Sequence, residues 1–255
     1  MSKVVEVHLE WKYTPSNYLE QPIKISKPGI HLEISGGVAV AHIEPETFEK
    51  DSSISDDLTK LIENRLYAIQ VLTHKIFSLS KPSRTDLRED GKRNVFLESH
   101  LVSKSIVSDV DLIITDKDGN VVSDTKQDRL DKQKWLSETI DRYRNTDITL
   151  DCILKSYQMS ISDSNNEFVH LYEIRDALSS RFGNNQNDAI KALCLTKKQW
   201  STIGILANEK PLEQGRHRGK SAGMLRSADS TELEEARRAM SNLIEKYLIY
   251  LEKTR

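Results

Sequence analysis

The sequence predicts an α+β protein in which a β-rich part with one long helix precedes an all-helical bundle. Near the N-terminus, apolar and polar residues alternate with a period of two, which is typical of strands with one buried face. From about Asp128 onward, the apolar residues instead recur with a helical period of about 3.6 residues. We therefore predict a β-rich mixed domain over residues 1–126 and a helical bundle over residues 127–255.

The composition is that of a soluble globular protein and argues against one that coats nucleic acid with its whole surface. Of the 255 residues, 30% are charged and 37% are hydrophobic, and the formal net charge is -2. Because the charge is nearly balanced, contact with a polyanion requires a local basic patch. Cys152 and Cys194 lack the cysteine or histidine spacing of a zinc site, so we expect both thiols to be reduced and buried.

The first strand of the β-rich part is predicted near the N-terminus, where Val5, Val7, Leu9 and Trp11 alternate with polar residues. This alternation differs from a signal peptide, and no apolar run reaches transmembrane length. We therefore expect a cytoplasmic protein that makes no membrane contact.

The remaining elements of the β-rich part are separated by turn residues. Gly36-Gly37 separates the run Ile30–Ile34 from Val38–Ile43, which predicts a hairpin, and Ile23 and Ile25 precede Pro28-Gly29. Helical spacing follows over residues 56–77, and short strands resume near residues 95–97 and 110–114. The last of these strands is expected to pair with Val121-Val122 across a turn at residues 116–119.

The helical part contains five predicted segments. The third ends at Gly183, the fourth begins after Thr196 as its N-cap, and the last begins after Asp229, with Glu232 in the capping-box position. In each of the first two segments, apolar residues recur with a helical period, and the last of them are Tyr143 and Tyr157.

Three histidines in predicted strands, His8, His31 and His42, could bind a metal if they shared one face of a sheet. We find no carboxylate or cysteine at a matching spacing, so polar surface histidines explain them better. We therefore expect no metal and no cofactor. Residues 81–93 carry a local charge of +2 and are interpreted as a solvated loop, with a phosphate-contacting loop as the alternative.

Residues 208–226, which we call the basic loop, carry a local charge of +3. Three glycines in this loop allow a bulky anion to approach the backbone, arginines can grip phosphate, and His217 supplies a titratable imidazole. The five cations of the loop are Lys210, Arg216, Arg218, Lys220 and Arg226. Alternatively, the arginines pair with acids on neighbouring helices, such as Glu173 or Asp176.

The segment LYEIRDALSSRFG at Leu171–Gly183, followed by ANEKPLEQGRHRGK and a long closing helix, resembles the C-terminal part of HEPN-superfamily bundles. The resemblance covers about residues 128–255. It implies a dimeric bundle that binds or cuts RNA without metal, often in toxin or antiviral defence systems. The family's arginine precedes its histidine by four to six intervening residues. Here Arg216 is adjacent to His217, and Lys210 occupies the position with six intervening residues.

The resemblance and the basic loop together predict an RNA-binding protein of bacterial defence or stress response, with metal-independent endoribonuclease activity in the catalytic version. His217 would then act as the general base, Arg216 would stabilise the developing charge, and Lys210 would be an auxiliary cation. Phosphate binding is assigned to Arg218, Lys220 and Arg226.

Two further expectations concern the partners of the chain. Apolar residues on more than one side of the closing helix, such as Tyr247 and Tyr250, predict a homodimer, and a protein partner encoded nearby is a further expectation. The alternative function is a non-catalytic dimeric interaction or nucleotide-sensing module, whose basic loop docks an acidic partner. A DNA-binding regulator is a third option, but no helix-turn-helix with a basic recognition helix is evident.

Overall fold

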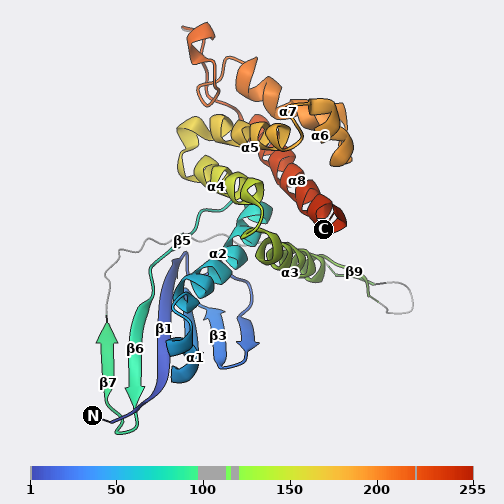
Figure 1. Cartoon of the computed structure of the whole chain (residues 1–255). Helices are drawn as coiled ribbons and strands as arrows, with labels where there is room; N and C mark the ends of the chain where they lie inside the picture. Colours follow the sequence, from blue (N-terminus) through green and yellow to red (C-terminus); the bar gives the residue numbers. More distant parts are fainter. Residues whose placement is uncertain (1, 97–112, 116–120, 222, 255) are drawn as a thin grey trace. The chain divides into compact units, whose positions relative to one another are not determined.

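The computed structural model describes residues 2–96, 113–115, 121–221 and 223–254, and it confirms the predicted α+β class. The chain forms two compact units, which are described separately (Figure 1). The sheet unit comprises Met1–Ile69 and Phe77–Lys126, and the helical unit comprises Gln70–Ile76 and Gln127–Arg255. The end of the long helix predicted over residues 56–77 therefore groups with the helical unit.

The sheet unit is built on an antiparallel sheet whose strand order is β2-β3-β4-β1-β6-β7. The short strand β5 pairs with the end of β1, whereas β8 and β9 form a separate antiparallel pair. The strands are β1 (Val4–Thr14), β2 (Ile23–Lys27), β3 (Ile30–Ser35), β4 (Val38–Ile43), β5 (Ser78–Leu79), β6 (Ser83–Arg88), β7 (Arg93–Phe96), β8 (Ile113–Thr115) and β9 (Val121–Asp124).

One face of this sheet is buried and the other is polar. On β1, Val7, Leu9 and Trp11 are buried, and the Trp11 indole donates a hydrogen bond of 2.9 Å to Thr59 of α2. Helices α1 (Pro45–Lys50) and α2 (Ile54–Thr73) accompany the sheet in Figure 1. The residues that alternate with this buried set carry polar side chains on the opposite face.

Several strand predictions are confirmed, and the interpretation of residues 81–93 is corrected. The hairpin at Gly36-Gly37 is confirmed, a further hairpin forms at Gly29, and each of these glycines has a positive φ. Residues 81–93 do not form a loop throughout, because β6 pairs with β1 and its Arg84 and Asp86 form an ion pair of 2.6 Å on one face. The pairing of β8 with β9 is confirmed, but the turn expected at residues 116–119 lies outside the described residues.

The helical unit contains a core formed largely by α4, α5, α7 and α8. Helix α4 packs against α5, and α5 and α7 both pack against α8. The helices are α3 (Thr125–Tyr143), α4 (Ile148–Ser162), α5 (Glu167–Arg181), α6 (Gln186–Ala192), α7 (Lys197–Asn208) and α8 (Ser230–Thr254), with short 3-10 turns η1 (Ser164–Asn166) and η2 (Arg218–Ser221).

The predicted helix boundaries of the helical unit are largely confirmed by cap geometry. Thr196 and Gln199 form a capping box at the start of α7, and Asp229 and Glu232 bond reciprocally at the start of α8. The sequence does not predict helix α6, because its seven residues are too few to show a helical apolar pattern.

The predicted burial of the two cysteines is wrong, since both thiols are free and exposed. Cys152 lies on the exposed side of α4, because Leu150, Ile153 and Leu154 occupy the buried side. Among the described residues, no helix has the length and apolar character needed to span a membrane.

Candidate functional site

The base of the basic loop is closed by charge pairing with Glu232, which is buried in the first turn of α8. Arg226 donates two hydrogen bonds of 2.7 Å to the two carboxylate oxygens, and the Lys210 ammonium lies 2.8 Å from Oε1. The Arg226 hydrogen bonds hold the pKa of Glu232 far below its usual range, with Lys210 assisting against the opposing effect of burial. Lys210 and Arg226 therefore anchor the loop to α8.

The side chain of Arg216 packs against two residues of α5. Its guanidinium sits 4.1 Å from the centre of the Tyr172 ring, and its Nη1 lies 3.5 Å from Asp176 Oδ2. The loop is fixed here by the Arg216 amide, which donates a hydrogen bond of 2.7 Å to the Ala207 carbonyl. Gly215 permits this approach, because a Cβ there would lie 2.9 Å from the Ala207 oxygen. The alternative pairing with an acid such as Asp176 is thus present.

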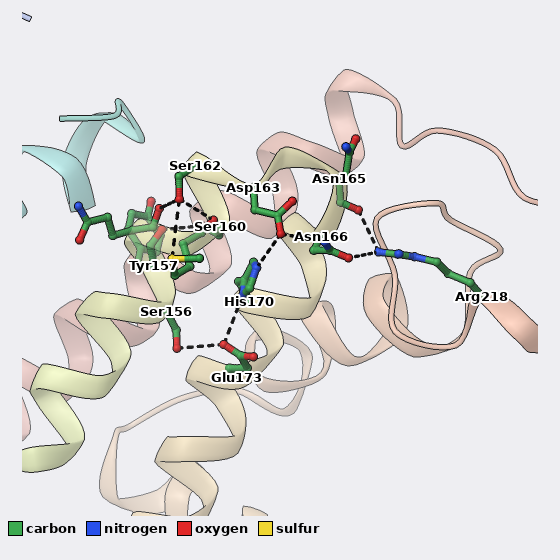
Figure 2. Close-up of polar contacts among 12 residues, drawn as sticks. Ser156, Tyr157, Ser160, Ser162, Asp163, Asn165, Asn166, His170, Glu173 and Arg218 are labelled. Atoms are coloured by element: carbon green, nitrogen blue, oxygen red, sulfur yellow. Dashed lines mark hydrogen bonds and ion pairs between the residues drawn. The ribbon is translucent and has the colours of Figure 1, made fainter. Parts of the chain in front are cut away.

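Arg218 binds the N-terminal end of α5 (Figure 2). Its Nη2 donates hydrogen bonds to the Asn165 carbonyl and to the side-chain oxygen of Asn166. Both of these acceptors are neutral, and among the residues that the structure describes no carboxylate pairs with the Arg218 guanidinium. By contrast, Lys210, Arg216 and Arg226 each contact a carboxylate.

A chain of polar contacts continues from Asn166 into the helical unit (Figure 2). The Asn166 amide donates a hydrogen bond of 2.8 Å to Asp163, and that carboxylate lies 3.3 Å from His170 Nε2. The other nitrogen of His170 lies 3.4 Å from Glu173, which also accepts a hydrogen bond of 3.1 Å from Ser156. The Asn166 and His170 hydrogen bonds lower the pKa of Asp163, so this network carries negative charge beside Arg218.

His217 and Lys220 lie on exposed parts of the loop. Within the described part of the chain, their side chains form no hydrogen bond or ion pair. The predicted catalytic set of His217, Arg216 and Lys210 is therefore dispersed: Lys210 contacts α8, Arg216 contacts α5, and His217 faces solvent.

A second cluster of charge surrounds Glu167, the first residue of α5, whose side chain is only 2% exposed. Arg237 of α8 grips both carboxylate oxygens, at 2.7 Å and 2.9 Å. His74 Nε2 approaches Oε1 at 3.3 Å. Burial raises the pKa of Glu167, but the hydrogen bonds and charges of Arg237 and His74 outweigh burial, so the net pKa is lowered.

His74 is held in a left-handed backbone conformation, with φ of 51° directly after the end of α2. Glycine or asparagine usually ends a helix in this conformation, so a histidine here carries backbone strain on the order of 1 kcal/mol. The imidazole packs edge-on against Tyr157, with ring centres 5.3 Å apart. If Nε2 donates to Glu167, Nδ1 carries the lone pair, and this buried atom has no hydrogen-bond partner.

His74, Tyr157 and Arg237 line a cavity of about 750 Å³ within the helical unit. The wall also carries the cations Arg238 and Lys132 and the acids Glu234 and Glu245, with Lys132 2.7 Å from Glu245. Burial raises the pKa of Tyr157 far above its usual value, so its hydroxyl stays protonated and can donate a hydrogen bond. We call this cavity, together with the ion pair between Glu167 and Arg237, the Glu167 cavity.

The basic loop and the Glu167 cavity meet at two consecutive residues of the chain. Asn166 binds Arg218 of the loop, and Glu167 binds Arg237 and His74 of the cavity. Consecutive Cα atoms lie about 3.8 Å apart. Arg218 of the loop and Arg237 of the cavity therefore both bind the N-terminal end of α5. The sequence does not single out His74 or Glu167, because both lie inside segments with ordinary helical spacing and no motif.

Comparison with known proteins gives no match for this chain among family models, curated proteins or solved structures. The candidate site is therefore interpreted from its own chemistry.

Proposed function

We propose that the helical unit binds RNA and that the Glu167 cavity cleaves it by general-base chemistry that needs no metal. The observation that carries the proposal is His74, which lines the cavity: its Nε2 faces a buried carboxylate, and its buried Nδ1 has no hydrogen-bond partner. A carboxylate that fixes one imidazole nitrogen leaves the other as a proton acceptor.

In the proposed reaction, a small movement of the cavity wall exposes the buried His74 Nδ1, which then accepts the proton of a ribose 2′-hydroxyl that enters the cavity. The 2′-oxygen attacks the adjacent phosphorus, the bond from phosphorus to the 5′-oxygen breaks, and that oxygen takes a proton from water. Arg237 and Arg238 stabilise the negative charge that builds on the phosphoryl oxygens. The products are a 2′,3′-cyclic phosphate and a free 5′-hydroxyl.

The basic loop supplies RNA affinity in this proposal. Arg218 and Lys220 have no carboxylate in direct contact among the described residues, so they are the loop cations most available to phosphate. Arg216 can exchange its exposed partner Asp176 for a phosphate, whereas Arg226 adds to the local potential while holding the loop in place. His217 is the rival general base, since it is exposed and belongs to the loop that resembles the HEPN pattern.

The proposed setting is the bacterial cytoplasm, in a defence or stress response, as the HEPN resemblance implies. The same resemblance implies a homodimer, and a protein partner encoded nearby belongs to this setting. Along α8, Tyr247 and Leu251 are buried, whereas Ile249 and Tyr250 stay partly exposed, which supports a contact with a second copy.

The test is incubation of the full chain with labelled RNA in the presence of a chelator. We expect cleavage that ends in cyclic phosphate, that is lost in His74→Asn, and that is retained in His217→Ala. Loss in His217→Ala alone would transfer the general base to the basic loop. Each variant is purified identically, so that a contaminating nuclease would appear as equal activity in all preparations.

A second candidate function is a non-catalytic interaction or nucleotide-sensing module. It is favoured by one observation: Lys210, Arg216 and Arg226 already contact carboxylates of the chain itself. A parent protein that neither binds nor cleaves RNA would support this candidate and refute the leading one.

A further inference from the structure

Three histidines, His8, His31 and His42, lie in a row on the polar face of the sheet unit. The strand register places His8 of β1 opposite His42 of β4, and His42 opposite His31 of β3. Residues directly opposite in an antiparallel pair share a face. Glu6 precedes His8 by two positions, so it lies on that face too.

Three of these side chains converge on one point. Glu6 Oε2 lies 2.8 Å from His8 Nε2, and Glu6 Oε1 lies 3.1 Å from His42 Nδ1. The two histidine nitrogens are 3.0 Å apart, with ring centres at 4.2 Å and planes inclined by 68°. In the part of the chain that the structure describes, this is the group of three potential metal ligands whose donor atoms gather within 4.8 Å.

Protons alone cannot satisfy all three contacts. A ring nitrogen carries either a proton or a lone pair, and a glutamate carboxylate only accepts. If both nitrogens donate to Glu6, their two N–H groups face each other across 3.0 Å. If His42 donates to both neighbours, the His8 lone pair faces a carboxylate oxygen across 2.8 Å. One of the three contacts is therefore repulsive in either arrangement.

A cation at the centre of the triangle makes all three contacts favourable. It requires a lone pair from each group, which neutral imidazoles and a carboxylate provide. Ligands of a tetrahedral zinc ion at about 2.0–2.1 Å lie roughly 3.3 Å from one another. The observed separations of 2.8 to 3.1 Å need only a small outward movement of side chains that are partly exposed.

We propose that Glu6, His8 and His42 form a binding site for a divalent transition-metal ion of the zinc type. Two imidazoles and one carboxylate suit zinc, and three protein ligands leave a coordination position for water or an outside ligand. His42 and Glu6 have exposed fractions of 44% and 38%, which gives an ion access from solvent. The proposal is independent of RNA binding, because all its residues belong to the sheet unit.

The expectation that no carboxylate stands at a matching spacing is wrong, because Glu6 joins His8 and His42 in one group. Glu6 was present at the spacing of two that a strand requires, but its partner His42 is brought alongside only by the pairing of β1 with β4. His31 is the histidine that does not join the triangle, and its Nδ1 instead lies 3.1 Å from the Ser26 hydroxyl.

The test is a zinc titration of the metal-stripped full chain, followed by calorimetry and by competition with a chromogenic chelator. We expect one zinc ion per chain, with affinity at least about tenfold weaker in Glu6→Gln and in His42→Ala, since even outer partners of metal ligands matter by that factor. His31→Ala is the matched control on the same face and should bind zinc like the parent.

A second measurement shows that the variants remain folded. The thermal midpoint of the parent should rise when zinc is added, because a ligand that binds only the folded state stabilises it. Glu6→Gln and His42→Ala should keep the metal-free midpoint of the parent and lose the rise. Equal weakening by His31→Ala would indicate that any histidine on this face binds zinc, and the absence of zinc binding in the parent would overturn the site outright.

Discussion

The basic loop and the Glu167 cavity use the same kinds of residue in opposite ways. In the loop, cations lie close together in sequence, and several are partly exposed and balanced by acids of neighbouring helices. In the cavity, His74, Glu167 and Arg237 come from three distant segments and share one carboxylate that is almost fully buried. Clustering in sequence thus marks a charged surface, whereas clustering in space marks a constrained group.

The difference follows from solvation. Water screens exposed charges, so Arg216 can exchange its exposed partner Asp176 for a phosphate at small cost, whereas Lys210 and Arg226 stay paired with the buried Glu232. A buried carboxylate must keep its partners, because removal of one leaves charge without solvent or counterion. We therefore expect the loop to control affinity and the cavity to control chemistry and stability.

The largest effect is expected for His74→Asn. Asparagine tolerates the left-handed backbone of this position, so the fold should persist, while the ring nitrogen that accepts a proton is removed. Cleavage of RNA should fall on the order of a hundredfold or more. Single-turnover rates in chelator measure this loss, and circular dichroism confirms the fold. Unchanged cleavage would exclude His74 as the base.

Glu167→Gln should destabilise the helical unit. The change leaves the Arg237 charge without its carboxylate, and loss of one partner of a buried pair costs about 3–5 kcal/mol. Because the Arg237 side chain is 35% exposed, solvent offsets part of this cost, and we expect roughly 2–3 kcal/mol. Urea unfolding of the full chain measures it. An equally stable variant would mean that the pair contributes nothing to folding.

Acidification should reveal the same pair. The folded-state pKa of Glu167 is lowered, so this group contributes stability that is present above its unfolded pKa of about 4.3 and is lost as pH falls through the folded pKa. Other lowered carboxylates, such as Glu232, contribute in the same direction. The decisive quantity is therefore the difference between parent and Glu167→Gln thermal midpoints, which should shrink below about pH 4.

Replacing Arg216 and Arg218 together by alanine should weaken RNA binding and spare the fold. Each phosphate contact that is lost on a single strand removes about 0.7 from the slope of log affinity against log salt, so two contacts remove about 1.4. The thermal midpoint should change little, because exposed pairs contribute little to stability. An unchanged salt slope accompanied by a large drop in midpoint would show that these arginines are structural.

The smallest effect is expected for Lys210→Ala. Arg226 retains both hydrogen bonds to Glu232, so the loop should stay anchored and stability should change by less than about 1 kcal/mol. RNA turnover should also remain at the parental level. A large loss of turnover would mean that Lys210 takes the place of the family's arginine, and it would move the chemistry from the cavity to the loop.

Local signals placed much of the fold correctly. Alternation along β1, the glycine turns before β3 and β4, and the caps at Thr196 and Asp229 all lie where the sequence indicated. These features depend on a few neighbouring residues, whose backbone preferences and side-chain bonds act within a turn or a strand. The basic loop was likewise visible as a local excess of charge.

The functional candidates, in contrast, were decided by tertiary structure. The sequence near Glu167 does not predict its contacts with His74 and Arg237, because they depend on how helices pack. The sequence near His8 does not predict its contact with His42, because that contact depends on strand register. By itself the sequence determined the α+β class, the alternating strand and the helix ends, through short-range periodicity and capping. Which titratable groups share a site was settled only when distant segments packed together and removed one carboxylate from water.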